Sequence, residues 1–89
     1  MPRPRLPEAR LAWAVELGQT LRAARVGLGL SREAVARLAG TSVGTLAKIE
    51  SAQTRSPEFY TVTRIALVLG QDLNRLAGSA TSPVEDAPG

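Results

Sequence analysis

The side chains in this sequence that can carry chemistry are mainly cations and hydroxyls, which bind anions. Residues 18–77 hold eight arginine or lysine residues against four aspartate or glutamate residues, a net charge of +4. Residues 78–89 carry Glu85 and Asp86 and no cation, a net charge of −2. Guanidinium and ammonium groups make charge-assisted hydrogen bonds to phosphate, and a surface with excess positive charge attracts polyanions. The charge pattern therefore favours nucleic-acid binding by the central segment.

Several kinds of chemistry are excluded because the 89 residues include neither cysteine nor histidine. Disulfides and Cys/His zinc sites cannot form, and we expect no metal and no cofactor. A Cys–His or Ser–His nucleophile and a histidine pH switch are excluded as well. Paired carboxylates occur only at Glu85 and Asp86, near the end of the chain. We therefore predict that the protein is not an enzyme.

Nothing in the sequence predicts an association with the membrane. The longest stretch without a charged residue is 38–47, whereas a membrane-spanning helix needs about 20 apolar residues. The arginines near the N-terminus are not followed by the apolar run of a signal peptide. We expect a cytoplasmic protein.

The composition favours an all-α fold in a single small domain. Apolar residues make up 44% of the chain, but Trp13, Phe59 and Tyr60 are its only aromatic residues. An interior built from small aliphatic side chains is more typical of packed helices than of a sheet. We expect residues 1–7 to form a flexible basic arm with Arg3 and Arg5, residues 8–77 to form the domain, and residues 78–89 to form a disordered tail.

Apolar spacing predicts a long first helix from Glu8 to Gly27. Its inward face repeats at intervals of three and four residues and comprises Trp13, Leu17, Leu21, Ala24 and Leu28. Gly27 and Gly29 are expected to end this helix, because glycine adopts the left-handed conformation that helix ends require.

Capping residues predict two short helices after the first. Ser31 is a typical N-cap for the second, with Glu33 placed favourably against the positive end of the helix dipole, and Gly40 stops this helix. Ser42 caps the third helix. Its inward residues are expected to be Leu46 and Ile49.

Two further helices complete an expected total of five. Ser56, Pro57 and Glu58 open the fourth, with serine as the cap and proline in the first turn. Its buried side is expected to comprise Val62, Ile65, Ala66 and Leu69. Gly70 ends it, and Asp72 can cap a last short helix. The apolar residues of that last helix are Leu73 and Leu76.

The segment from about residue 32 to residue 51 has the pattern of a helix-turn-helix. A tight turn between crossed helices needs a residue that tolerates positive φ, which Gly40 supplies. A close approach of the two helices needs a small side chain, which Ala36 supplies. The buried contact is expected to involve Val35, Leu38, Leu46 and Ile49. In this motif the second helix enters the major groove of DNA.

Residues 17–77 resemble the Xre/Cro family, the phage-repressor type of helix-turn-helix domain. The matching residues, in chain order, are Leu17-Gly18, Leu21-Arg22, Arg25, residues 29–36, Gly40-Thr41-Ser42, Leu46, Ile49-Glu50, Pro57, Ile65-Ala66, Leu69-Gly70, Leu73 and Leu76. The resemblance implies a compact five-helix, phage-repressor-like DNA-binding domain, here with an extended first helix. It also implies that the protein is a homodimer, a sequence-specific transcriptional repressor, and a partner of double-stranded DNA.

The outer face of the third helix is the candidate DNA-reading surface. With Leu46 and Ile49 inward, the outer residues at 100° per residue are Gly44, Ala47, Lys48 and Ser51, flanked by Val43 and Thr45. The resemblance implies that bases are read from Val43, Gly44 and Lys48, beside Ser42 and Thr45. Lys48 can bond guanine or a phosphate, whereas Val43 can only contact a thymine methyl. Because this face has few hydrogen-bond donors, we expect either DNA shape or the flanking arms to contribute more to recognition.

Two groups of residues are candidate phosphate anchors. Arg32 begins the second helix, where free amide groups and the helix dipole attract anions. The resemblance implies that Thr54, Arg55 and Ser56, in the loop after the third helix, hold the opposite DNA backbone. It also implies a partly buried structural ion pair between Arg25 and Glu50. The family usually has glycine where Ala52 stands, so we expect either local strain or a longer third helix there.

The sequence is also compatible with a function other than that of a DNA-binding repressor. The same fold serves as the antitoxin of toxin–antitoxin pairs, so a cognate toxin is an alternative partner. The homodimer contact is expected to involve Leu11, Trp13 or Val15, together with Leu73 and Leu76. Otherwise the N-terminal extension folds back onto its own subunit. Arg3 and Arg5 of the arm either reach a minor groove or stay solvated.

Overall fold

The computed structural model describes residues 6–54 and 56–72, which contain four α-helices and no strand. They are α1 (Leu6–Gly27), α2 (Arg32–Ala39), α3 (Val43–Glu50) and α4 (Phe59–Leu69). The all-α class is therefore confirmed. Several expectations lie outside the described residues: the arm with Arg3 and Arg5, the phosphate anchor Arg55, the fifth helix with Leu73 and Leu76, and the tail at 78–89.

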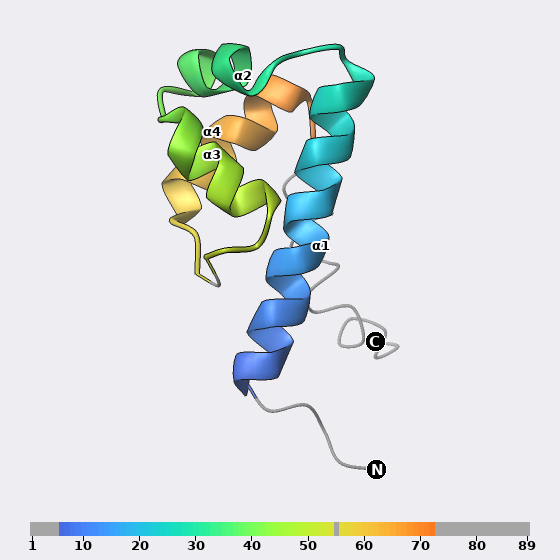
Figure 1. Ribbon diagram of the computed structural model, residues 1–89, viewed down its shortest axis with the longest axis vertical. Coiled ribbons are helices and arrows are strands. Elements are labelled where there is room, and N and C mark those ends of the chain that lie inside the picture. The colour runs from blue at the N-terminus through green and yellow to red at the C-terminus, as the bar shows by residue number, and fades with distance from the viewer. Residues whose placement is uncertain (1–5, 55, 73–89) are drawn as a thin grey trace, which may run out of the picture.

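The helices form a small bundle in which α1 is the longest element. It runs along one side of the three shorter helices, and its first turns extend beyond them (Figure 1). α1 packs against α3 and α4, and α2 packs against both α3 and α4. The α2–α3 pair is therefore held from two sides, by α1 and by α4.

The ends of α1 differ slightly from those expected. It begins at Leu6, so Leu6 and Pro7 belong to its first turn rather than to the arm. Proline is tolerated there because a first-turn amide has no intrahelical partner. At the other end, Leu28 is 57% exposed, so its expected place on the inward face is wrong. The helix has already ended at Gly27, and the chain turns away from the core through Gly29, whose φ is +71°.

The start of α4 also differs from its expected position. Its N-cap is Glu58 in an extended conformation, so Ser56 is not the cap and Pro57 lies before the helix. The first helical hydrogen bond runs from the amide of Val62 to the carbonyl of Glu58 (3.0 Å). Residues 56–58 stay outside the helix and join the loop after α3 to α4. The end of α4 is as expected, with Gly70 in the left-handed conformation.

One apolar core connects all four helices. Its buried members are Leu17, Leu21, Val35, Ala36, Ala39, Leu46, Ile49, Val62, Ile65, Ala66 and Leu69. The expected inward faces of α3 and α4 are confirmed, but the placement of Leu38 in the buried contact is wrong, because Leu38 is 54% exposed. At 100° per residue, Leu38 lies to one side of the inward stripe of α2.

Helices α1 and α3 approach each other closely at Gly18, in the middle of α1. A Cβ atom on this residue would lie 2.5 Å from the carbonyl oxygen of Ile49 and 2.6 Å from that of Glu50. Both atoms belong to the backbone of α3 and cannot turn away as a side chain would. Glycine is therefore required at position 18 for α1 to contact the last turn of α3.

We predict that Gly18→Ala destabilises the fold by about 1–3 kcal/mol, the usual cost of overpacking a core. Alanine is the better helix former by about 1 kcal/mol, but the clash with the α3 backbone outweighs that gain. Urea denaturation followed by circular dichroism measures the change. Gly44→Ala is the matched control, because the nearest atom to its added Cβ is 3.9 Å away. The control should be neutral or stabilising, and an equal gain in both variants would contradict the close approach.

Candidate nucleic-acid interface

The turn between α2 and α3 has the geometry of a helix-turn-helix. Gly40 ends α2 in the left-handed conformation (φ +74°, ψ +34°). The amide of Thr41 donates to the carbonyl of Ala36 at 2.9 Å, so the chain reverses tightly after α2. Ser31 caps α2 by accepting from the amide of Ala34 at 3.0 Å, as expected from the sequence. Local hydrogen bonds thus fix both ends of α2.

The hydroxyls at the start of α3 are arranged so that one of them keeps a free proton. Ser42 Oγ accepts from the amide of Thr45 at 3.0 Å and donates to Thr45 Oγ1 at 2.9 Å. The proton of Ser42 is therefore used within the chain. The hydroxyl of Thr45 accepts that bond and retains its own proton for a further acceptor. Of these two candidate residues, Thr45 is the better placed donor.

The side chains on the outward side of α3 are mostly small, and few of them are polar. Gly44, Thr45 and Lys48 are exposed, and Val43 is exposed to 37%. Space beside Gly44 is open, since only Ser42 Oγ lies within 4 Å of an added Cβ. α3 can therefore approach another surface closely along this side, with Lys48 as its cation.

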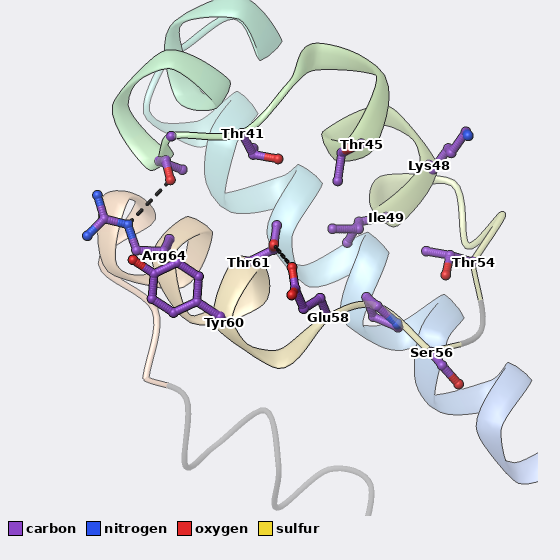
Figure 2. Close-up of a pocket in the computed structure, with 13 residues that line it drawn as sticks. Thr41, Thr45, Lys48, Ile49, Thr54, Ser56, Glu58, Tyr60, Thr61 and Arg64 are labelled. Carbon is purple, nitrogen blue, oxygen red and sulfur yellow. Dashed lines mark hydrogen bonds between the residues drawn. The ribbon is translucent and has the colours of Figure 1, made fainter.

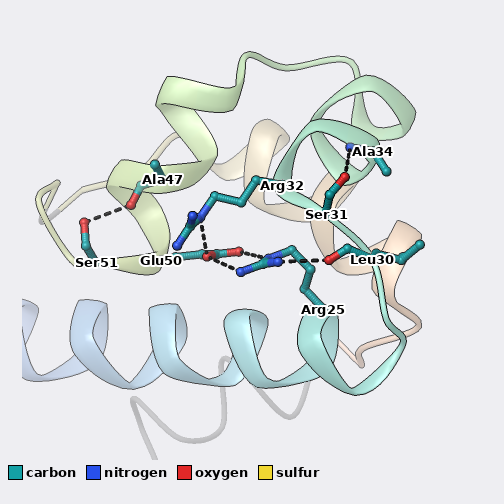
Figure 3. Close-up of polar contacts among 8 residues, drawn as sticks. All are labelled: Arg25, Leu30, Ser31, Arg32, Ala34, Ala47, Glu50 and Ser51. Atoms are coloured by element: carbon teal, nitrogen blue, oxygen red, sulfur yellow. Dashed lines mark hydrogen bonds and ion pairs between the residues drawn. The ribbon is translucent and has the colours of Figure 1, made fainter.

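The carboxylate of Glu50 is buried on the inner side of the helix-turn-helix motif and accepts hydrogen bonds from arginine side chains there (Figure 3). Arg25 of α1 donates from Nε to Glu50 Oε2 at 2.7 Å and from Nη2 to Glu50 Oε1 at 3.2 Å. Its Nη1 donates to the carbonyl of Leu30 at 2.9 Å. Both residues are buried, with 8% of Arg25 and 6% of Glu50 exposed. This ion pair joins α1 to the last residue of α3.

Arg32 is the third member of this cluster, a role that sequence reasoning missed. Its Nε donates to Glu50 Oε1 at 3.0 Å, while its side chain stays 43% exposed (Figure 3). Glu50 thus binds guanidinium groups from both α1 and α2. Two cations and one anion leave the cluster with a net charge of +1. The signal available in the sequence was the shortage of acidic residues, since Glu50 is the only carboxylate between Glu33 and Glu58.

A groove runs between α3 and the start of α4 (Figure 2). It is open to solvent, has a volume of about 530 Å³, and carries hydroxyls, two cations and one carboxylate. Its polar side chains are those of Thr41, Thr45, Lys48, Thr54, Ser56, Glu58, Tyr60, Thr61 and Arg64. Of the candidate residues, Thr45, Lys48 and Thr54 come together here.

Arg64 and Tyr60 are groove residues that the sequence analysis did not identify. Both lie on the exposed side of α4, four residues apart, and that spacing was the available signal. Arg64 Nε donates to the carbonyl of Ala39 at 3.3 Å, which connects α4 to the end of α2. The carboxylate of Glu58 accepts from Thr61 Oγ1 at 2.8 Å. The groove therefore presents donors from α3, from the following loop and from α4.

The loop after α3 contains a strained residue. Ala52 has φ +59°, where L-residues are disfavoured and glycine is usual. α3 ends at Glu50, so of the two expected outcomes the structure shows strain and not a longer helix. The amide of Gln53 donates to the carbonyl of Lys48 at 2.8 Å and closes the end of α3. This turn leads the chain back toward Thr54 and the groove.

The side chains exposed on these surfaces include cations and hydroxyls, which bind anions. No group of three or more His, Cys, Asp or Glu side chains gathers within residues 6–54 and 56–72. Over the same residues, no helix combines the length and apolarity that a membrane crossing requires. Lys48, Arg32 and Arg64 are exposed, and cationic and hydroxyl side chains are the kinds of group that can bind phosphates and base edges.

A family model described as a helix-turn-helix domain matches residues 16–77. The chain belongs to the helix-turn-helix domain family. The match covers α2, the turn, α3 and α4, and it begins in α1 just before Leu17. No curated protein matches the chain. As a helix-turn-helix domain, the protein is a DNA-binding domain of the kind that regulates transcription.

The helix-turn-helix domain should lose stability when the buried cluster is broken. We predict that Arg25→Met costs about 3–5 kcal/mol, because the Glu50 carboxylate stays buried and loses two of its three hydrogen bonds. Chemical denaturation measures the loss. Arg22→Met removes an exposed arginine from the preceding turn of α1 and should change stability by less than about 0.5 kcal/mol. Equal stability of the two variants would show that the buried pair contributes nothing.

Proposed function

We propose that this helix-turn-helix domain is a cytoplasmic, non-enzymatic repressor that binds specific sites in double-stranded DNA. The observation that carries the proposal is the exposed outer side of α3, which carries Lys48 and Thr45 and has room beside Gly44 for close contact. The opposite side of α3 is held in place by the bonds of Glu50 and by the contact with Gly18 of α1. Lys48 is the exposed cation of α3, and the free proton of Thr45 lies one turn away. In a helix-turn-helix the second helix lies in the major groove and contacts base edges with its exposed residues, while its inner side packs on the rest of the domain.

In the proposed complex, α3 lies in the major groove and the flanking residues hold the two DNA backbones. Arg32 contacts a phosphate at the start of α2, and Thr54 and Arg55 contact the opposite strand. Val43, Gly44 and Lys48 face the base edges, with Ser42 and Thr45 at the start of the helix. Because this face offers few donors, the DNA sequence is selected through groove shape and deformability as well as through direct contacts.

We predict that binding to duplex DNA weakens steeply as salt increases, because each neutralised phosphate contributes about −0.9 to the slope of log K against log salt. Arg32→Ala and Arg55→Ala should each weaken binding to all sequences and flatten this slope by about 0.9. Fluorescence anisotropy with a labelled duplex, at several salt concentrations, measures both effects. Arg10→Ala is the control, because Arg10 lies in the extension of α1, two turns before Gly18. Unchanged slopes for the Arg32 and Arg55 variants would contradict this DNA-binding face.

We further propose that the domain acts as a homodimer. Leu11 and Val15 are each 38% exposed and lie one turn apart near the start of α1, whereas Trp13 packs against the core of its own chain. A dimer places two recognition helices about 34 Å apart on one face of DNA. When one copy of a dimer binds DNA, the effective concentration of the other copy at the DNA rises. This compensates for weak DNA binding by a single copy. Leu11 and Val15 are therefore the contact residues that we propose.

Sedimentation at micromolar concentration should give a mass of twice 9.4 kDa for the wild-type protein. The double variant Leu11→Glu/Val15→Glu should sediment as a monomer, because burying two carboxylates in an apolar contact is unfavourable. Ala23→Glu adds a charge at an exposed position on another side of α1 and should stay dimeric. A monomeric wild type would contradict the dimer. It would favour the alternative in which Leu11 and Val15 bind a different protein, such as the toxin partner of an antitoxin.

A further inference from the structure

The buried carboxylate of Glu50 binds a second arginine, Arg32, although the ion pair with Arg25 does not require it. All three guanidinium nitrogens of Arg25 already bind Glu50 or the carbonyl of Leu30. This one arginine is enough to balance the charge of Glu50. Arg32 nevertheless donates its Nε to the same carboxylate at 3.0 Å. The positive charge of Arg32 is therefore in excess, and it lies on the exposed side of the cluster.

The geometry leaves one edge of Arg32 available. Only its Nε is used, and within the described residues Nη1 and Nη2 have no hydrogen-bond partner. A guanidinium group is planar, so a bond at Nε fixes the plane in which the two terminal nitrogens lie. These two nitrogens form the edge that binds phosphate oxygens in a bidentate manner. The side chain is 43% exposed, so a ligand can reach that edge.

We propose that Glu50 is a positioning residue for DNA binding, acting through Arg32 on a backbone phosphate. This inference rests on the proposed function, because it assigns the orientation of one of its phosphate anchors. Glu50 cannot touch DNA itself, since only 2% of its side chain is exposed. It holds Arg32 in one orientation before DNA arrives, so less rotamer freedom is lost on binding. The same carboxylate thus joins the core contact of α1 and α3 to the phosphate contact of α2.

A double-mutant cycle on DNA affinity tests this role. The variants are Glu50→Gln, Arg32→Gln and the double variant, with a random-sequence duplex as the probe and the folded fraction measured for each protein. We expect Glu50→Gln to weaken binding about tenfold after correction for folding, the scale of one hydrogen bond to a charged group. In the Arg32→Gln background the same change should have no further effect on affinity. Glu50→Gln should still lower the stability in both backgrounds, because the substitution removes the charged partner of Arg25.

Arg32→Lys gives a second test that leaves the Arg25–Glu50 pair intact. Lysine keeps the positive charge but lacks Nε and the planar edge. We expect the salt dependence of binding to be retained and the affinity to fall several-fold. Wild-type affinity for Arg32→Lys would overturn the proposal, because charge alone would then be sufficient. Equal effects of Glu50→Gln in both backgrounds, or tighter binding by Glu50→Gln, would also overturn it. Absence of DNA binding by the wild-type protein at low salt would overturn the proposed function as well.

Discussion

The interaction on which the structure depends is the burial of one carboxylate at the end of α3. Glu50 accepts hydrogen bonds from Arg25 of α1 and Arg32 of α2, so a single side chain fixes three helices relative to one another. A buried charge is costly to desolvate, and the cost is offset only when its partners are placed accurately. Any displacement of α1 or α2 from α3 therefore removes hydrogen bonds from a group that water does not reach. This requirement gives the helix-turn-helix motif one orientation on the rest of the domain.

The inner and outer sides of α3 differ sharply in chemical content. Its inner side holds Leu46, Ile49 and Glu50, all buried, while its outer side carries one lysine, one available hydroxyl proton and an open glycine. Contacts to phosphates give affinity and register but no direct sequence information, and base contacts give specificity. In the proposed complex the domain therefore obtains more of its affinity than of its selectivity from the side chains around α3. Selectivity in that proposed complex comes from DNA shape and from the pairing of two domains through the proposed contact at Leu11 and Val15 of α1.

Local signals in the sequence were sufficient for the four described helices and most of the core, but not for contacts between distant segments. Ser31, Gly40 and Ser42 mark helix ends through bonds to neighbouring residues, so their roles can be read from spacing alone. Leu28 and Leu38 were misplaced because periodicity does not tell where a stripe ends or how wide the inward face of a short helix is. Ser56 was misplaced as a cap because its type fits either position. The contact of Gly18 with the α3 backbone and the bond from Arg32 to Glu50 join residues far apart in the chain, and their geometry appears only once the helices are packed.

The contact at Gly18 has a consequence for which positions can change: the outer face of α3 can vary in sequence, whereas position 18 is constrained. α3 touches α1 there through carbonyl oxygens, which every amino acid supplies, so the contact is indifferent to the side chains on the outer face of α3. Substitutions at Val43, Gly44 and Lys48 can accumulate without altering how the helix sits on the domain. A side chain at position 18, in contrast, would meet the backbone of α3. In the proposed complex, the residues that face the bases can therefore change while the backbone contact that positions α3 stays the same.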